Sequence, residues 1–287
     1  MMYYVLFPQY DPVCFSLGSL SVYWYGIVYL LSFFITKWLV VQRSKCFVYI
    51  GISKEKILDL LYCCFIGMII GGRVGYVIFY QFGFFYLHPL EVLKIWHGGM
   101  SFHGGLLGIV FVVLFYLRSM YCFFCFTDLL SPIIPLSLGM GRFANFINGE
   151  LWGKVSVLCP FAMFFPNSYL RDIEFLCYAP SNYQRLFDQY GVLPRHPVQL
   201  YEMFLEGLCL FVLLNLFIKK ARPVGSVSGV FLIVYGIFRI FSEFFRDADV
   251  FLCFLQKFYI SMGQFLSFFM VLFGLVIILC SYSFCRC

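Results

Sequence analysis

Arginine, glutamate and histidine side chains that can do chemistry occur in a few short segments of an otherwise apolar chain. Arg142 ends one apolar run, Arg239 and Glu243 end another, and His103 begins a third. An ionised group inside a bilayer costs at least about 2.5–3.5 kcal/mol at mid-depth, so it usually marks function. Clustered arginines in that medium need an anionic partner. The residue types therefore predict a site for a phosphate group, and a phospholipid is its nearest source.

The composition predicts that lipid surrounds these groups. Of the 287 residues, 62% are hydrophobic and 12% are charged, whereas soluble domains have about 25% charged residues. We expect a single integral membrane domain, 1–287, built from α-helices. The formal charge of +6 forms no basic stripe on a soluble face, so no nucleic-acid partner is expected.

A helix that crosses the hydrocarbon core needs about 20 mostly apolar residues. The segments that meet this rule are 20–41, 57–80, 100–117, 123–140, 198–218, 224–244 and 262–281. We therefore expect an all-α polytopic membrane protein with about seven transmembrane helices. Residues 141–197 are too polar to span and too aromatic for a loose linker, so they are predicted to form a small extracytoplasmic cap between the fourth and fifth helices.

The basic residues of alternate loops predict the orientation. Lys and Arg gather in 42–56, at Arg118, in 219–222 and at Arg286, and cytoplasmic loops carry such an excess. The N-terminus is thus predicted outside and the C-terminus in the cytoplasm. This topology places Tyr25, Arg73, His103, Arg142, His196, Glu202, Arg239 and Glu243 in the outer leaflet or at its rim. Asp59, Asp128 and Glu206 fall elsewhere, and we expect them at helix ends or between helices.

Ordinary structural roles remain open for several of these residues. An arginine near a helix end, such as Arg73, often extends its charge to the interface, and a single histidine is more often a helix–helix hydrogen-bonding group than a base. His97 and His103 flank pairs of glycines, which let a ligand or a second helix approach closely. Their spacing is not a metal motif without nearby cysteine or carboxylate ligands. We expect no metal and no cofactor.

Most of the thirteen cysteines lie in apolar runs, where cysteine behaves as a small hydrophobic residue. Cys122 and Cys125 lack the second pair that a zinc or redox motif would favour. Cys159 and Cys177 both lie in the cap segment, and the sequence leaves open whether they pair.

The segment 141–153, GRFANFINGELWG, resembles the signature of the prolipoprotein diacylglyceryl transferase family, bacterial enzymes that lipidate lipoprotein precursors. Similar segments follow the family order along the chain, at 24–26, 72–76, 97–105, 195–202, 239–246 and 263–267. The resemblance implies transfer of the diacylglyceryl group of phosphatidylglycerol to the lipobox cysteine thiol of a prolipoprotein signal peptide. A thioether forms and glycerol phosphate leaves. It also implies a place in the bacterial cytoplasmic (inner) membrane, with the active site facing the outer leaflet.

The resemblance also implies roles for single residues. The catalytic residues are expected to be His103, Arg142 and Arg239. The arginines suit a phosphate leaving group, and His103 either removes the thiol proton or contacts the headgroup, because the thiolate is the nucleophile. Phosphatidylglycerol is expected to be bound by the two arginines together with Tyr25, Asn145 and Asn148. Supporting positions are Glu150, Gly153, His196, Tyr235 and Glu243. Of these, Glu150 and Glu243 are expected to orient the arginines, and Gly153 to permit a tight turn.

Two other classes of protein are weighed against this interpretation. A transporter or channel for an anionic solute could use the same arginines, but the sequence lacks an internal repeat and the cluster is one-sided. A headgroup transferase of the CDP-alcohol type would need a carboxylate-rich metal motif, which the sequence does not contain. Formation of a thioether without added metal or nucleotide would separate the three.

Overall fold

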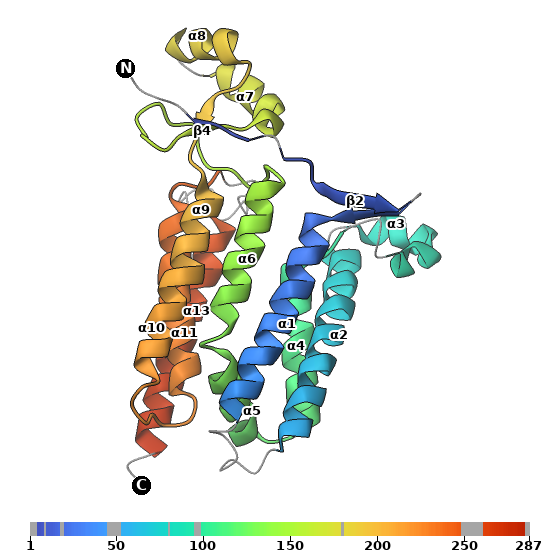
Figure 1. Cartoon of the computed structure of the whole chain (residues 1–287), viewed down its shortest axis with the longest axis vertical. Coiled ribbons are helices and arrows are strands. Elements are labelled where there is room, and N and C mark those ends of the chain that lie inside the picture. Colours follow the sequence, from blue (N-terminus) through green and yellow to red (C-terminus); the bar gives the residue numbers. More distant parts are fainter. Residues whose placement is uncertain are drawn as a thin grey trace. The chain divides into compact units, whose positions relative to one another are not determined.

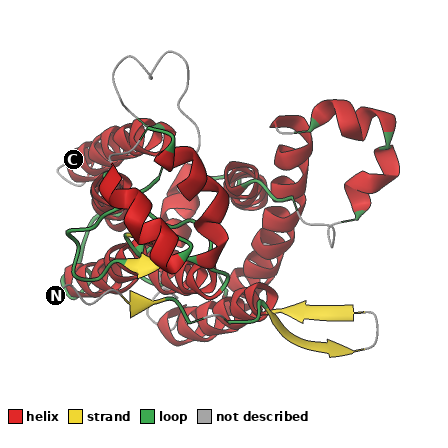
Figure 2. Ribbon diagram, turned by 90° about the horizontal axis from the view of Figure 1, so that it is seen from above, coloured by secondary structure: helices red, strands yellow, loops and turns green. Residues whose placement is uncertain are grey.

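The computed structural model describes residues 5–8, 10–17, 20–44, 53–79, 81–94, 99–178, 181–247 and 261–284. The chain divides into two compact units, one formed by Met1–Phe34 with Ser131–Cys287 and the other by Ile35–Leu130. Helices dominate both units and the strands are short (Figure 1, Figure 2). The predicted all-α polytopic class is confirmed.

Five helices are long and apolar enough to cross a membrane: Trp24–Arg43, Lys54–Ile78, Val198–Phe217, Ser226–Glu243 and Gly263–Ser283. The predicted third span corresponds to a shorter apolar helix, Gly104–Leu117. The predicted fourth span, 123–140, is interrupted, because a turn at 131–133 separates α5 (Met120–Leu130) from α6 (Ile134–Ile147). Pro132 in this turn cannot continue a helical hydrogen-bond ladder. Counting α5 and α6 as one broken span gives up to six spans among the described residues, so the structure does not confirm seven.

The unit of residues 35–130 is built on two closely packed helices. Its elements are α2 (Lys54–Phe79), α3 (Phe82–Leu87), η2 (Pro89–Leu93), α4 (Phe102–Leu117) and α5. A Cβ added at Gly104 would lie 2.3 Å from the carbonyl oxygen of Gly71, and one at Gly108 would lie 2.1 Å from that of Gly67. The backbones of α2 and α4 therefore touch, as small residues allow in membranes.

The helices of the other unit are α6, α9 (Val198–Glu202), η5 (Met203–Cys209), α10 (Leu210–Phe217), α11 (Ser226–Glu243) and α13 (Met262–Phe284). Helix α1 (Trp24–Ser44) begins in this unit and continues into the other. The segment η5 is a π-helix between α9 and α10. Helix α11 packs against α13 and α10 (Figure 1), around a core of Leu210, Leu214, Val227 and Tyr235.

A small mixed structure follows α6, and we call residues 148–197 the cap. It contains β4 (Met163–Phe164), η4 (Pro166–Ser168), α7 (Tyr169–Leu176), α8 (Ser181–Tyr190) and β5 (Pro194–Arg195). Strand β4 pairs in parallel with β1 (Val5–Leu6) and antiparallel with β5. Strands β2 (Val13–Leu17) and β3 (Leu20–Tyr23) form a separate hairpin. Because α6 extends to Ile147, the first residues of the predicted 141–197 segment belong to a helix.

Candidate active site

Arg142 lies on α6 and points toward two glutamates of the helix that follows the cap. Its Nε and Nη2 donate to Oε2 of Glu206 at 3.2 and 3.1 Å. Its Nη1 lies 3.1 Å from Oε2 of Glu202. Three nitrogens of one guanidinium therefore face two carboxylates, which fixes the plane of the group.

Arg239, on α11, contacts the same two glutamates. Its Nη1 donates to Oε1 of Glu202 and lies 3.6 Å from Oε1 of Glu206. Its Nη2 lies 3.0 Å from Glu243, one helical turn further along α11. Glu202 is also 3.6 Å from Arg246, just beyond the end of α11. We call these six residues, Arg142, Arg239, Arg246, Glu202, Glu206 and Glu243, the arginine cluster.

The arginine cluster is formally neutral, because three arginines meet three glutamates. The sequence placed Glu206 away from these residues, whereas the structure places it beside Arg142 and Arg239. The side chains of Glu202 and Glu206 have no exposed area, whereas those of Arg142 and Arg239 are 17% and 13% exposed. The two glutamates form the interior of the cluster, and the side chains of the two arginines keep a small exposed area.

The π-helix η5 carries Glu206, and α9 immediately before it ends at Glu202. Short π-helical segments inside α-helices often occur at functional sites. Glu202 and Glu206 are four residues apart, a spacing that places two side chains on one face of a helix. That spacing alone did not show which arginines they meet.

Two predicted headgroup residues are brought together beside α6. The hydroxyl of Tyr25 on α1 donates to Oδ1 of Asn145 on α6 at 2.5 Å, and Asn145 is buried. Tyr235 is buried on α11, close enough to Arg142 to interact electrostatically. Asn148 ends α6, and its backbone carbonyl accepts from Asn167 of the cap at 3.1 Å.

Glu150 lies just beyond α6, in the cap. Burial raises the pKa of its carboxyl, and a hydrogen bond with Asn148 partly opposes the shift. Its backbone carbonyl accepts from Nε2 of Gln199 at 2.6 Å. The ion pairs of Arg142 are with Glu202 and Glu206, and an orienting role for Glu150 stays a prediction.

Gly153 permits a close approach of three chain segments rather than a turn. Its N–H donates to the carbonyl of His196 at 2.8 Å, and it bridges to Arg246. A Cβ at this position would lie 2.5 Å from the carbonyl oxygen of Phe245. Only glycine leaves room for this close approach. The contact holds the cap against Arg246, a member of the arginine cluster.

An ion pair between Arg195 and Asp172 links two parts of the cap next to Gly153. Arg195 is fully buried and donates from Nε to Oδ1 of Asp172 at 2.8 Å. Its Nη1 donates to the carbonyl of Gly153 at 3.0 Å and to Asp247 at 2.7 Å. A buried ion pair thus holds the cap together, and Arg195 also joins it to the partly exposed Asp247 after α11.

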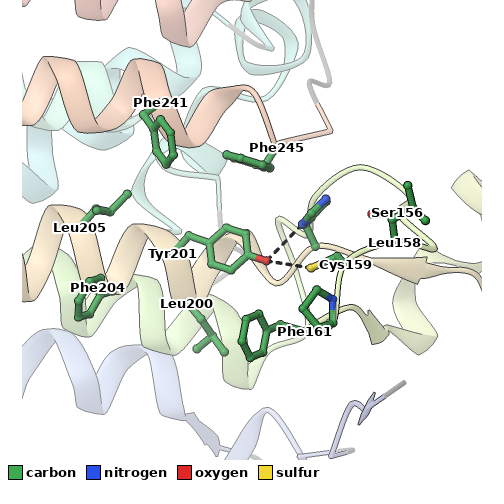
Figure 3. A pocket seen from close by; sticks show the side chains of 12 residues that line it. Ser156, Leu158, Cys159, Phe161, Leu200, Tyr201, Phe204, Leu205, Phe241 and Phe245 are labelled. Atoms are coloured by element: carbon green, nitrogen blue, oxygen red, sulfur yellow. Dashed lines mark hydrogen bonds between the residues drawn. The ribbon is translucent and has the colours of Figure 1, made fainter. Parts of the chain in front are cut away.

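An apolar groove of about 650 Å³ lies on another face of α9, η5 and α11, under the cap loop. Figure 3 shows Tyr201 within it, with its hydroxyl between Cys159 and an imidazole. That hydroxyl is 3.5 Å from the sulfur of Cys159 and 3.2 Å from Nδ1 of His196. Burial and the nearby Lys154 lower the pKa of His196. Cys159 and Cys177 are both free thiols, which answers the question that their spacing left open.

His103 lies in the first turn of α4, in the unit of residues 35–130. Helix α4 begins at a capped end, where Oγ of Ser101 accepts from the N–H of Gly104 at 3.2 Å. The side chain of His103, and all of His97, lie outside the described part of the chain. Within the described ranges, no group of three or more His, Cys, Asp or Glu residues is arranged to hold a metal ion.

The sequence predicted Arg73 in the same layer as Arg142 and Arg239. It lies on α2, in the unit that carries His103, and its hydrogen bonds are to residues of that unit. It donates to the backbone carbonyls of Glu91, Val92, Lys94 and Gly99 at 2.7–3.1 Å. Its guanidinium carbon is 5.1 Å from the ring centre of Phe85. Its described contacts are therefore with backbone carbonyls and aromatic rings.

Comparison with known proteins gives a family match over most of the chain. Residues 12–280 match the model of the family described as "Prolipoprotein diacylglyceryl transferase". A relative from Citrobacter koseri is 50% identical over 282 residues, which cover 97% of this chain and 96% of that protein. Relatives from Yersinia enterocolitica and Sodalis glossinidius are each 51% identical and cover 97% and 98% of this chain and 96% of their own lengths. All three are named phosphatidylglycerol–prolipoprotein diacylglyceryl transferase.

Proposed function

This chain belongs to the prolipoprotein diacylglyceryl transferase family, and from that premise we propose that its arginine cluster binds the phosphate of phosphatidylglycerol during transfer. The protein is a multi-pass membrane transferase that acts in lipoprotein biosynthesis. It moves the diacylglyceryl group of phosphatidylglycerol to prolipoproteins, the first step of their maturation.

The observation that supports the phosphate site is the difference in exposure within the cluster. Arg142 and Arg239 are partly exposed, and the glutamates behind them are not. An anion that reaches the cluster can therefore approach the arginine side chains, while the carboxylates stay behind them. Each arginine is held in plane by carboxylates, so it is oriented before the lipid binds. Preorganised donors of this kind stabilise charge that develops on a leaving group.

The proposed reaction uses these groups in one displacement. The thiolate sulfur of the lipobox cysteine attacks the glyceryl carbon that carries the phosphate. A carbon–sulfur bond forms, the carbon–oxygen bond breaks, and the electron pair leaves with glycerol phosphate. His103 takes the thiol proton, because an ordinary imidazole pKa of about 6.5 lets it act as a base near neutral pH. The hydrogen bond between Tyr25 and Asn145 places two polar groups for the glycerol headgroup.

We also propose the membrane in which the protein lies and its orientation there. The lysines and arginines of the alternate loops support a C-terminus in the cytoplasm, an N-terminus outside and an active site open to the outer leaflet of the inner membrane. The cysteine of a signal peptide is presented at that face. A fluorescent protein fused to the C-terminus should fluoresce, and alkaline phosphatase fused there should be inactive. The reverse pattern would refute the orientation.

One assay tests the reaction and the site together. Purified protein, phosphatidylglycerol and a lipobox peptide should yield a diacylglyceryl thioether, detected by mass, without added metal or nucleotide. Arg142→Ala, Arg239→Ala and His103→Ala should each reduce the rate by about a hundredfold or more, as loss of a charge-stabilising donor or base does.

Arg222→Ala is the matched control for those variants. Arg222 is exposed and donates to the carbonyl of Phe217 at 3.2 Å, so its loss should leave the rate unchanged. If the wild type forms no thioether, the activity is refuted. If Arg142→Ala and Arg239→Ala transfer as fast as Arg222→Ala, the proposed phosphate site is refuted.

A further inference from the structure

We propose that residues 81–94, which we call the arm, lie embedded in the membrane interface, with the lipid bilayer as their partner. The arm consists of α3, η2 and the residues that flank them, and it belongs to the unit of residues 35–130. Arg73 makes the position possible by bonding the arm's backbone.

The arm exposes large apolar side chains along nearly its whole length. The exposed fractions are 62% for Phe82, 77% for Tyr86, 73% for Leu87, 75% for Leu90 and 72% for Leu93. Soluble surfaces rarely present so continuous an apolar patch, and such patches mark contact with a protein or a membrane. The arm therefore needs a cover of hydrocarbon character.

Its attachment points place the arm at the end of two apolar helices. It starts two residues after α2, a helix that can span the membrane. The chain returns through Ser101, whose N–H donates to the carbonyl of Gly72 on α2 at 2.8 Å, and α4 begins directly afterwards. The arm therefore begins directly after a span and is bonded back to that span at Lys94, whose carbonyl accepts from Arg73 of α2. This attachment places it next to the end of α2, where a span meets the headgroups.

The charged groups of the arm fit this depth. Glu91 and Lys94 form an ion pair at 2.5 Å, one helical turn apart. Each charge thus has its neutralising partner inside the arm, as partial burial in an apolar medium requires. Phe85 is the buried aromatic residue of α3, and it lies under the guanidinium of Arg73.

Backbone outside regular helices has unpaired carbonyls, which are unfavourable near lipid. Arg73 provides hydrogen-bond donors for such carbonyls in the arm. Carbonyls that lack a partner in an apolar medium cost several kcal/mol each, on the order of a lost hydrogen bond or more. The carbonyl of Glu91 accepts from the N–H of Lys94 at 3.2 Å, but the other last carbonyls of so short a helix have no partner within it. Arg73 donates to the carbonyls of Val92 and Lys94 in the arm, and also to those of Glu91 and Gly99. The negative end of η2 and the ring of Phe85 in turn stabilise its charge.

The test is a photocrosslinking experiment on full-length protein in vesicles of phosphatidylethanolamine and phosphatidylglycerol. A diazirine amino acid is placed at one site at a time: Leu90 in the arm, Leu107 on α4 and Tyr178 in the cap. Leu107 is 62% exposed on an apolar helix and is the positive control; Tyr178 is 94% exposed outside the helices and is the negative control. Mass spectrometry then identifies what each site has captured.

The proposal expects phospholipid adducts at position 90 within about twofold of those at position 107, and about tenfold above those at position 178, since interfacial helices bury their apolar face in the acyl boundary. In an Arg73→Gln background, the lipid adduct at position 90 should fall severalfold while that at position 107 stays unchanged. Water addition at position 90, or a covalent dimer in place of a lipid adduct, would overturn the proposal. An adduct that persists unchanged with Arg73→Gln would overturn the role of Arg73.

Discussion

Arg142 donates two hydrogen bonds to a single carboxylate oxygen of Glu206, from Nε at 3.2 Å and from Nη2 at 3.1 Å. The pair joins α6 to the π-helix η5. It also holds a guanidinium that we propose contacts the lipid phosphate. We therefore expect this pair to contribute both to stability and to transfer.

Glu206→Gln is expected to destabilise the protein and slow transfer. Breaking a buried ion pair costs about 3–5 kcal/mol of unfolding free energy. We expect a loss near the lower value, because Arg142 still pairs in the variant with Glu202, which lies at 3.1 Å. The thermal unfolding midpoint in detergent measures this. Glu174→Gln removes an exposed pair with Arg171 at 3.1 Å, which is worth about 0–1 kcal/mol. Equal shifts in the two variants would contradict the importance given to Glu206.

Asp172→Asn is expected to loosen the cap. The buried carboxylate accepts from Ser168 at 2.7 Å, from the N–H of Leu193 at 2.9 Å and from Arg195 at 2.8 Å. An amide cannot accept from all of them or balance the charge of Arg195. Limited proteolysis should therefore cut within 148–197 sooner than in the wild type. Asp188→Asn, an exposed carboxylate bonded to Gln184, should leave the cleavage rate unchanged, and a similar rate in both would refute the role of Asp172.

His196 should make the stability of the protein depend on pH. Burial, and then Lys154, lowers the pKa of His196 from its usual 6.5, so between the lowered value and 6.5 the unfolded chain binds more protons than the folded protein. The stability that neutral His196 contributes is complete above about pH 6.5 and is lost as the pH falls through this window.

The comparison with His196→Asn isolates this contribution. The unfolding midpoint of the wild type should fall further between pH 7.5 and pH 5.5, each about one unit from the ordinary histidine pKa, than that of the variant. Glu150 has the opposite sign, since burial raises its pKa, but both proteins contain it. Parallel curves would show that His196 does not titrate in this way.

Gly108→Ala is expected to separate α2 from α4. The added methyl group would lie 2.1 Å from the carbonyl oxygen of Gly67, and such overpacking costs about 1–3 kcal/mol. Because α4 carries His103 in its first turn, transfer should slow as well as the unfolding midpoint falling. Gly83→Ala is the control, since nothing lies within 4 Å of its added methyl group. Equal behaviour of the two variants would contradict the close contact.

Hydropathy was enough to establish the class of the protein, because the length and composition of an apolar segment are local properties of the chain. The motif at 141–153 and its companions were enough to indicate the family, which the comparisons confirm. The number of spans was less certain, because Pro132 sits within the predicted segment 123–140 and interrupts its helix.

The partners of the arginines were beyond the sequence. Arg142, Arg239 and Glu206 are far apart along the chain, and only the packing of α6, η5 and α11 brings them together. Topology by itself therefore placed Glu206 outside the cluster. Gly153 was similarly interpreted as a turn residue, whereas its role depends on three segments that meet only after folding.

The sequence by itself thus determined that the protein is an integral membrane protein and a member of the diacylglyceryl transferase family. Only the tertiary structure decided that fully buried glutamates neutralise the arginines, whose side chains stay partly exposed. The reason is physical: insertion into lipid depends on the composition of each segment, while the charge balance of a site depends on which segments the fold brings within a few ångströms of one another.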